Sequence, residues 1–158
     1  MKILIHRDRD ALTDTEMEMI RASYTHSDIE AWLPETWDIE HYFCSPEILA
    51  GLRNTSTEEA MTELQAIVTR RQIVFRQNFD KVRRTINEEL YPGGGSPVSD
   101  RVWNEFQASS PLRVKGKMLM NEIINSNQSA VDRSTLVRTA IDGELASDLR
   151  GKLREMLG

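Results

Sequence analysis

Two aspartates stand one residue apart, directly after a short apolar run near the start of the sequence. Asp8 and Asp10 end the stretch ILIHRDRD. Side chains alternate along an extended chain, so both carboxylates project from the same side if the backbone stays extended there. Carboxylate oxygens are the hard ligands that Mg²⁺ and Mn²⁺ prefer. The pair is a candidate cation site, and the alternative is a pair of solvated loop acids or a cap for the following helix.

A second acidic pair lies in the stretch WDIEHYF. Asp38 and Glu40 stand close to the end of a second predicted strand. If the two strands are neighbours, four carboxylates converge, and such a group is costly without a cation because like charges repel. Alternatively, Asp38 or Glu40 caps the helix that follows, or pairs with Arg7 or Arg9.

The elements that position these acids follow a strand, helix, strand order. Residues 3–5 predict a short buried strand, and alternation over residues 29–33 predicts a second strand that ends near Pro34. Between them, Thr13 and Glu16 have the spacing of a capping box, which predicts a helix start. This order predicts an α/β fold with a parallel sheet, in which ligands bind at the carboxyl ends of the strands.

The rest of the chain is predicted to be mostly helical. Ser45 and Pro46 form a helix start, and Ser56 with Glu59 opens a long amphipathic helix or a kinked pair that ends near Leu90. Shorter helices are predicted after a cap at Ser99, from Gly116 and Lys117, over residues 132–141 and over residues 147–157. The chain then divides into an α/β segment with the acidic motifs (1–53), a helical region with the long amphipathic helix (54–110) and a carboxyl-terminal helical segment with the Gly-Lys pair (111–158).

Composition limits the classes of function. The 158 residues are 39% hydrophobic and 28% charged, which is typical of one globular domain. The formal net charge of −5 makes the whole chain repel nucleic acid, so any phosphate contact must be local. The single cysteine, Cys44, excludes an internal disulfide and fits a reducing compartment. No apolar run is long enough to be a leader or to cross a membrane, and we expect a cytoplasmic protein.

Two further groups have competing interpretations. Six basic residues between positions 70 and 84 form either a footprint for a DNA backbone or a solvated helix face that nearby glutamates offset. His6, inside the first predicted strand, is expected to be a packed core residue. The six basic residues are Arg70, Arg71, Arg76, Lys81, Arg83 and Arg84.

The segments ILIHRDRDALTDTE, WDIEHYF and VKGKMLMNEI together resemble the Toprim domain of the OLD-family (overcoming lysogenization defect) nucleases. In that family an Asp-x-Asp strand precedes a helix, then a segment similar to E-I-E-N-Y-[LF], and later a Gly-Lys pair at a helix start. Asp8 and Asp10 match the first motif, residues 38–43 match the second, and Gly116 with Lys117 matches the third. Position 38 is aspartate where the family often has glutamate, and position 41 is histidine where asparagine is usual.

The resemblance implies metal-dependent cleavage of DNA with Mg²⁺ or Mn²⁺. Asp8, Asp10 and Glu40 would be metal ligands, with Asp38 an alternate ligand or a support for one. In such two-metal sites one cation activates water and the other stabilises the leaving oxygen. Because Glu40 would hold a cation that takes part in the reaction, the resemblance also implies a catalytic role for it. Lys117 would stabilise charge on the scissile phosphate. The fold implied is a partial Toprim-like parallel sheet with a mostly helical carboxyl-terminal region.

The resemblance also implies partners. Toprim domains carry a glutamate on an earlier strand, and OLD nucleases carry an ATPase domain before it, and neither is found in this sequence. We therefore expect an upstream ATPase and a Toprim amino-terminal half in the same or a partner chain, with DNA as substrate, no membrane and self-association of the chain. The alternative function is a non-catalytic helical assembly or DNA-docking module that retains a relic carboxylate cluster.

Overall fold

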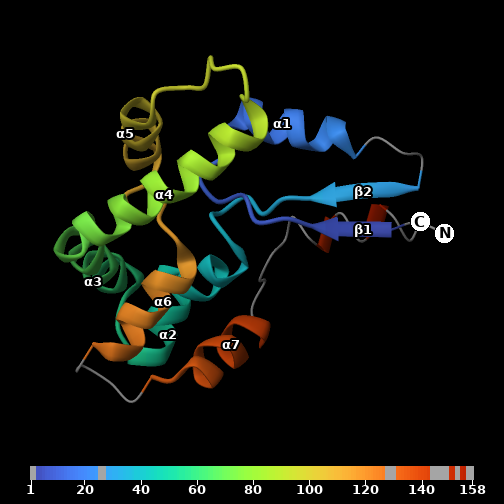
Figure 1. Ribbon diagram of the computed structural model, residues 1–158. Helices are drawn as coiled ribbons and strands as arrows, with labels where there is room; N and C mark the ends of the chain where they lie inside the picture. Colours follow the sequence, from blue (N-terminus) through green and yellow to red (C-terminus); the bar gives the residue numbers. More distant parts are fainter. Residues whose placement is uncertain (1–2, 25–27, 127–130, 143–149, 152–153, 156–158) are drawn as a thin grey trace.

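The computed structural model describes residues 3–24, 28–126, 131–142, 150–151 and 154–155 (Figure 1). The described part of the chain is mostly helical, with a small two-stranded parallel sheet. The elements, in chain order, are β1 (Ile3–His6), α1 (Asp14–Ser23), β2 (Ile29–Trp32), the 3-10 helix η1 (Ile39–Cys44), α2 (Pro46–Arg53), α3 (Thr57–Arg70), α4 (Gln72–Leu90), α5 (Ser99–Ser109), α6 (Gly116–Asn125) and α7 (Arg133–Asp142).

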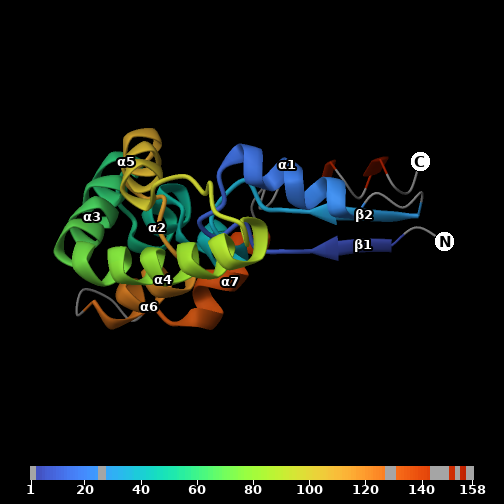
Figure 2. The same ribbon diagram turned by 45° about the horizontal axis from the view of Figure 1, so that its top comes forward.

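The strand, helix, strand order of the amino-terminal segment is confirmed. β1 and β2 pair in parallel, with Ile3 opposite Ile29 and His6 opposite Trp32, and α1 connects them. The capping box at the start of α1 is present. The strand pair projects from the helical body in both ribbon views (Figures 1 and 2). The prediction of a buried first strand is wrong, because each strand has one partner among the described residues, and Ile3 is 41% exposed.

The predicted long helix is a broken pair. α3 ends at Arg70 and α4 begins at Gln72, with Arg71 between them. The caps at Ser45 and Ser56 are confirmed. The predicted cap at Ser99 is wrong, because Val98 precedes the first turn of α5 and no side chain caps it. The helix predicted over 132–141 is α7, and most of the one predicted over 147–157 lies outside the described residues.

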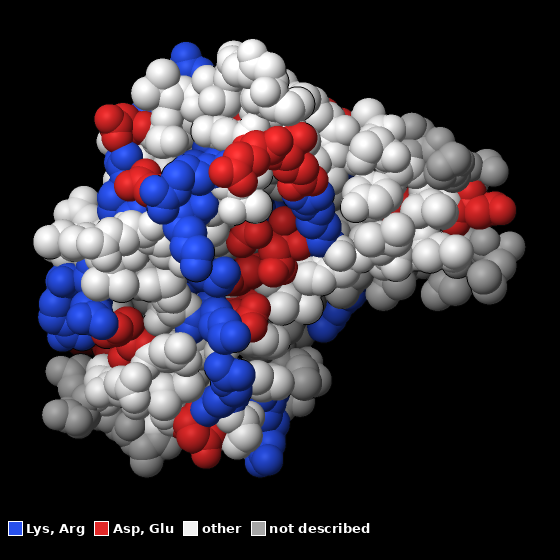
Figure 3. All heavy atoms as spheres, viewed as in Figure 1, with Lys and Arg blue, Asp and Glu red and all other residues white. Residues whose placement is uncertain are grey.

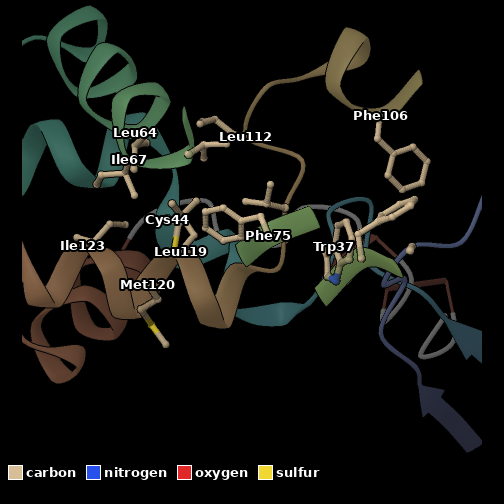
Figure 4. Close-up of a cluster of buried hydrophobic side chains, with 14 of the residues drawn as sticks. Trp37, Cys44, Leu64, Ile67, Phe75, Phe106, Leu112, Leu119, Met120 and Ile123 are labelled. Carbon is tan, nitrogen blue, oxygen red and sulfur yellow. The ribbon is translucent and has the colours of Figure 1, made fainter. Parts of the chain in front are cut away.

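The hydrophobic core lies among the helices. Figure 4 shows side chains from η1, α3, α4, α5 and α6 turned into one interior. At its centre the fully buried Phe79 ring packs against Trp37, Trp103 and Phe106, with ring centroids 5.1–6.1 Å from it. Such aromatic contacts favour tilted and edge-on geometry. Trp37 follows β2, so its burial ties the segment between the strand ends and η1 to the helical body.

A buried ion pair joins α1 to α4. The Arg83 guanidinium donates to both carboxylate oxygens of Glu16, over 2.6 and 2.9 Å, and both side chains have no exposed surface. The same guanidinium donates to the carbonyl of Ala11 over 3.1 Å and to Asn87 Oδ1 over 3.0 Å. A buried charge is tolerated only when an opposite charge and hydrogen bonds compensate it, as these do, although Arg83 Nε has no partner. Arg83 therefore holds the loop that follows β1 against α4.

Candidate functional site

The backbone turns sharply at Asp10, the second aspartate of the first motif. Asp10 has a φ of +48°, and its N–H donates to the carbonyl of Trp37 over 2.6 Å. Positive φ is uncommon for residues other than glycine, although aspartate tolerates it better than most. The chain does not stay extended here, so the expectation of two carboxylates on one side of a strand is wrong. The turn instead brings the Asp10 backbone against the segment that follows β2.

Asp8 lies two residues beyond the carboxyl end of β1, on the side of the helical body. Its side chain is 41% exposed, and its Oδ1 lies 3.2 Å from Nε2 of His6. The His6 ring packs against Trp32 with centroids 4.9 Å apart. The prediction of His6 as a core residue is wrong, because β1 faces outward at this position and His6 is exposed. Asp8 and His6 together form an accessible polar group at the end of the strand.

Asp38 connects the second and third sequence motifs. It is 1% exposed, and its Oδ1 accepts hydrogen bonds from the backbone N–H of His41 over 3.0 Å and of Gly116 over 3.1 Å. Its Oδ2 accepts from the N–H of Lys117 over 3.4 Å. The carboxylate thus caps both η1 and α6, where unpaired N–H groups and the helix dipole favour a negative charge. The Gly-Lys pair is held beside the acidic segment by this one side chain.

Gly116 makes that contact sterically feasible. A Cβ at this position would lie 2.2 Å from Asp38 Oδ1 and 2.2 Å from the backbone nitrogen of His41. The neighbouring residue Val114 accepts a hydrogen bond from His41 Nδ1 over 3.1 Å, with the ring in the tautomer that carries its proton on Nδ1. Burial lowers the pKa of His41, which favours this neutral form. The start of α6 and the start of η1 therefore fit together at backbone distance.

The acids of the first two motifs influence one another electrostatically. Burial raises the pKa of Asp38 to about 6, and the charges of Glu40 and Asp8 add to that effect, while the N–H groups of Lys117 and His41 oppose it. Burial also raises the pKa of Asp10; the charge of Asp8 adds to the rise, and other nearby groups oppose it. Figure 3 shows acidic side chains gathered between the carboxyl end of α4 and the start of α6, beside a band of Lys and Arg. The predicted ligands Asp8 and Glu40 are close enough for their charges to raise the pKa of Asp38, and the charge of Asp8 also acts on Asp10.

Two lysines flank Gly116, and the family resemblance assigns a role only to Lys117. Lys117 is exposed at the first turn of α6. Lys115, the residue immediately before the glycine, is partly buried, and its charge lowers the pKa of Asp10. The spacing Lys-Gly-Lys was the available signal, because it places a lysine on each side of the close contact. Lys115 joins Lys117 as a cation at this site.

The carboxylate oxygens of the first two motifs are the type of ligand that a hard divalent cation prefers. Their positions in the structure match a cation site only in part. Both oxygens of Asp38 already accept backbone hydrogen bonds, so this residue acts here as a helix cap. Within the described ranges, no three His, Cys, Asp or Glu side chains are grouped closely enough to hold a metal ion. Asp8, Asp10 and Glu40 remain candidate ligands, but their side chains would have to move closer together to bind one cation.

Three of the six residues in the predicted basic footprint form ion pairs with acidic residues of the same chain. Arg83 is fully buried in its ion pair with α1. Arg76 pairs with carboxylates of α4 and α5, and its guanidinium lies 5.5 Å from the centroid of Trp103. Arg71 donates to Glu122 of α6 over 2.8 Å. The members left exposed without such an assignment are Arg70, Lys81 and Arg84.

Comparisons with protein-family models, with curated proteins and with solved structures found no significant match for this chain. None of the described helices combines the length and hydrophobicity needed to span a bilayer.

The titration of Asp38 gives a direct test of this geometry. Its carboxyl carbon resonance should titrate in the folded protein with a midpoint near pH 6. Because the raised pKa means that the folded state binds the proton more tightly, the stabilisation from this group is complete below about pH 4 and is lost as the pH rises through 6. NMR titration checks the midpoint, and the Asp38→Asn variant should lose it. A midpoint near 4 would contradict the burial and charge placement described here.

Proposed function

We propose that this chain is a metal-dependent DNA endonuclease module of the OLD and Toprim type. The observation that carries the proposal is the joining of the second and third motifs, which lie 78 residues apart, by the hydrogen bonds from Gly116 and Lys117 to Asp38. The charges of Asp8 and Glu40 act on the same carboxylate. These contacts and charges link residues of all three motifs, which supports the proposal.

The residues have separate roles in this proposal. Asp8, Asp10 and Glu40 hold the divalent cation, which supplies an activated water and a counter-charge for the leaving oxygen. Asp38 is a positioning residue, because its oxygens hold the start of α6. Lys117, which is exposed at that start, binds a phosphate oxygen of the DNA. Lys115 acts on Asp10 with its charge and so opposes the repulsion between Asp10 and Asp8.

The proposed module acts together with an upstream ATPase and a Toprim amino-terminal half, in the same or a partner chain. The described strands β1 and β2 pair only with each other, so one edge of each has no strand beside it in the described part. Parallel sheets are normally buried on both faces and continued at their edges. A further strand there would bring an additional carboxylate to Asp8 and Asp10 and complete the set of ligands.

Metal binding and cleavage are measured on the same variants. Titration calorimetry should detect weak Mn²⁺ binding, and Asp8→Ala should abolish that heat because an accessible ligand is lost. Lys117→Ala should leave the heat unchanged and slow the nicking of supercoiled plasmid in Mn²⁺ by about 10²–10³-fold, since the lysine stabilises developing charge on the phosphate.

Two exposed residues away from the site serve as matched controls. Glu58→Ala removes an acid from the first turn of α3, and Arg101→Ala removes an exposed cation of α5 that is outside the basic footprint. Neither change should alter the heat or the rate. Equal Mn²⁺ heat in the wild type and in Asp8→Ala would overturn the assignment of the ligands, whether or not the isolated chain cleaves DNA.

One observation favours the alternative function, a helical assembly or DNA-docking module with a relic carboxylate cluster. In the described part of the chain no three candidate ligands are grouped for a metal, and Asp38 has become a helix cap. Under this function the chain binds duplex DNA in EDTA as tightly as in Mn²⁺, and Arg84→Ala weakens binding more than Asp8→Ala does. A salt titration of DNA binding distinguishes the two functions.

A further inference from the structure

A cleft of about 240 Å³ lies between the segment that follows β2 and the loop that joins α5 to α6. Two arginines line it from opposite segments, Arg9 from the loop after β1 and Arg113 from the loop before α6. The hydroxyl-bearing residues Thr36, Ser109 and Ser110 line it as well. A cleft with two guanidinium groups and several hydroxyls has the chemistry of an anion site.

Arg9 is buried with part of its donor capacity unused. The residue is 9% exposed, and its Nη1 and Nη2 donate to the Glu35 carbonyl over 3.0 Å and to Asp14 Oδ1 over 2.6 Å. Its Nε is enclosed and has no hydrogen-bond partner. Leaving a buried donor unpaired costs about 1–3 kcal/mol, so the Arg9 charge is incompletely compensated and favours an anion in the cleft.

Arg113 is held mainly by stacking. Its guanidinium carbon lies 3.7 Å from the centroid of the Phe106 ring, and its Nη1 makes one long hydrogen bond of 3.4 Å to Ser109 Oγ. Its Nη2 is enclosed without a partner. A planar group that slides on an aromatic face and has one weak hydrogen bond can turn toward the cleft at little cost.

The charges of Arg9 and Arg113 favour an anion in the cleft. Burial and the charge of Arg9 both lower the pKa of Arg113, to about 10, and Asp14 opposes them. Asp14 is already bonded to Arg9 and is mostly exposed, and Glu35, which also lines the cleft, is exposed. No carboxylate among the described residues forms an ion pair with Arg113, so its charge is the one that a ligand would neutralise.

We propose that this cleft is a binding site for a phosphate group, with the Arg113 guanidinium turned into the cleft as its main donor, and with the charge of Arg9 and the Ser109 and Ser110 hydroxyls beside it. A phosphate presents two oxygens at once to the planar fork of an arginine, which is the geometry that arginine matches best. The volume also admits the first atoms of the molecule that carries the phosphate. That molecule is either a free phosphate compound or the phosphorylated end of a nucleic acid strand, because both present the same group.

Calorimetry in EDTA tests the site without any metal, so the result is independent of the proposed nuclease function. Inorganic phosphate should bind the full chain, and Arg113→Gln should lower the affinity at least 10-fold. Arg113→Lys should lower it less, because it keeps the charge and loses the planar fork. Arg101→Gln is the matched control, since Arg101 is an exposed arginine of α5 outside the cleft, and it should bind phosphate as the wild type does.

Two trinucleotides, with a 5′-phosphate and with a 5′-hydroxyl, distinguish the sources of the group. Tighter binding of the phosphorylated one than of inorganic phosphate assigns the site to strand ends, and equal binding assigns it to free phosphate compounds. Circular dichroism melting shows that each variant is folded, and Arg113→Lys replaces Arg113→Gln in the comparison if the latter is not. Absence of phosphate binding at millimolar concentration, or equal affinity in a folded Arg113 variant and the wild type, would overturn the proposal.

Discussion

Replacing Arg83 with methionine should destabilise the protein by about 3–5 kcal/mol, because the change leaves the Glu16 carboxylate buried without its cation. The pair has no exposed surface, so water cannot replace the lost hydrogen bonds. The expected fall in the melting temperature is about 10 °C or more for a chain of this size. Chemical denaturation monitored by circular dichroism measures the loss.

A second variant and a neighbouring arginine make this test specific. Arg84→Met changes the next residue of α4, which is exposed, and should alter stability by less than about 0.5 kcal/mol. Adding Glu16→Gln to Arg83→Met should recover part of the loss, because a neutral amide replaces the unpaired charge and still accepts the N–H of Thr13. Equal stability of the Arg83 and Arg84 variants would show that the pair is not buried.

Replacing Gly116 with alanine should cost about 3 kcal/mol, near the upper end of the usual cost of overpacking. The added methyl would lie 2.2 Å from Asp38 Oδ1 and from the backbone of His41, and backbone cannot move aside as a flexible side chain does. Separation of η1 from α6 would also break the hydrogen bonds that Asp38 accepts from Gly116 and Lys117. Thermal melting gives the loss, and the amide resonances of these two residues should shift most.

Gly51→Ala provides the matched control. Gly51 is in the middle of α2, and an added Cβ would meet nothing within 4 Å. Alanine is favoured over glycine by about 1 kcal/mol inside a helix, so this variant should be slightly more stable than the wild type. A Gly116→Ala protein that melts with the wild type would contradict the close approach of η1 and α6.

Local signals in the sequence were sufficient for most of the helix starts, though not for the cap of α5, and for the two strands. The capping boxes at Thr13 and Ser56 depend on residues three positions apart, and both are present. The break at Arg71 had no comparable signal, because no proline or glycine marks it. The exposure of β1 was also missed, since an apolar run of three residues looks the same whether the strand has one neighbour or two.

The sequence was sufficient to predict which residues belong to the candidate site. It was not sufficient to predict how their side chains contact one another. The motifs indicated that residues 38–43 and Gly116 belong together, while the capping of α6 by Asp38 depends on a long-range packing arrangement that no spacing encodes. The positive φ of Asp10 is equally invisible, because the same residue fits an extended strand. The role of Arg113 was missed because a lone arginine in a loop carries no periodic signal.

The hydrogen bond from Gly116 to Asp38 has a consequence for the order in which the molecule folds. Asp38 emerges from the ribosome well before Gly116, and closing a loop of 78 residues costs about 4 kcal/mol of chain entropy beyond a constant. A ten-residue helix such as α6 is marginal in isolation and depends on docking for its stability. The region around Asp38 and Lys117 is therefore completed late in folding, and the exchange rates of the Gly116 and Lys117 amide protons report each time that α6 undocks.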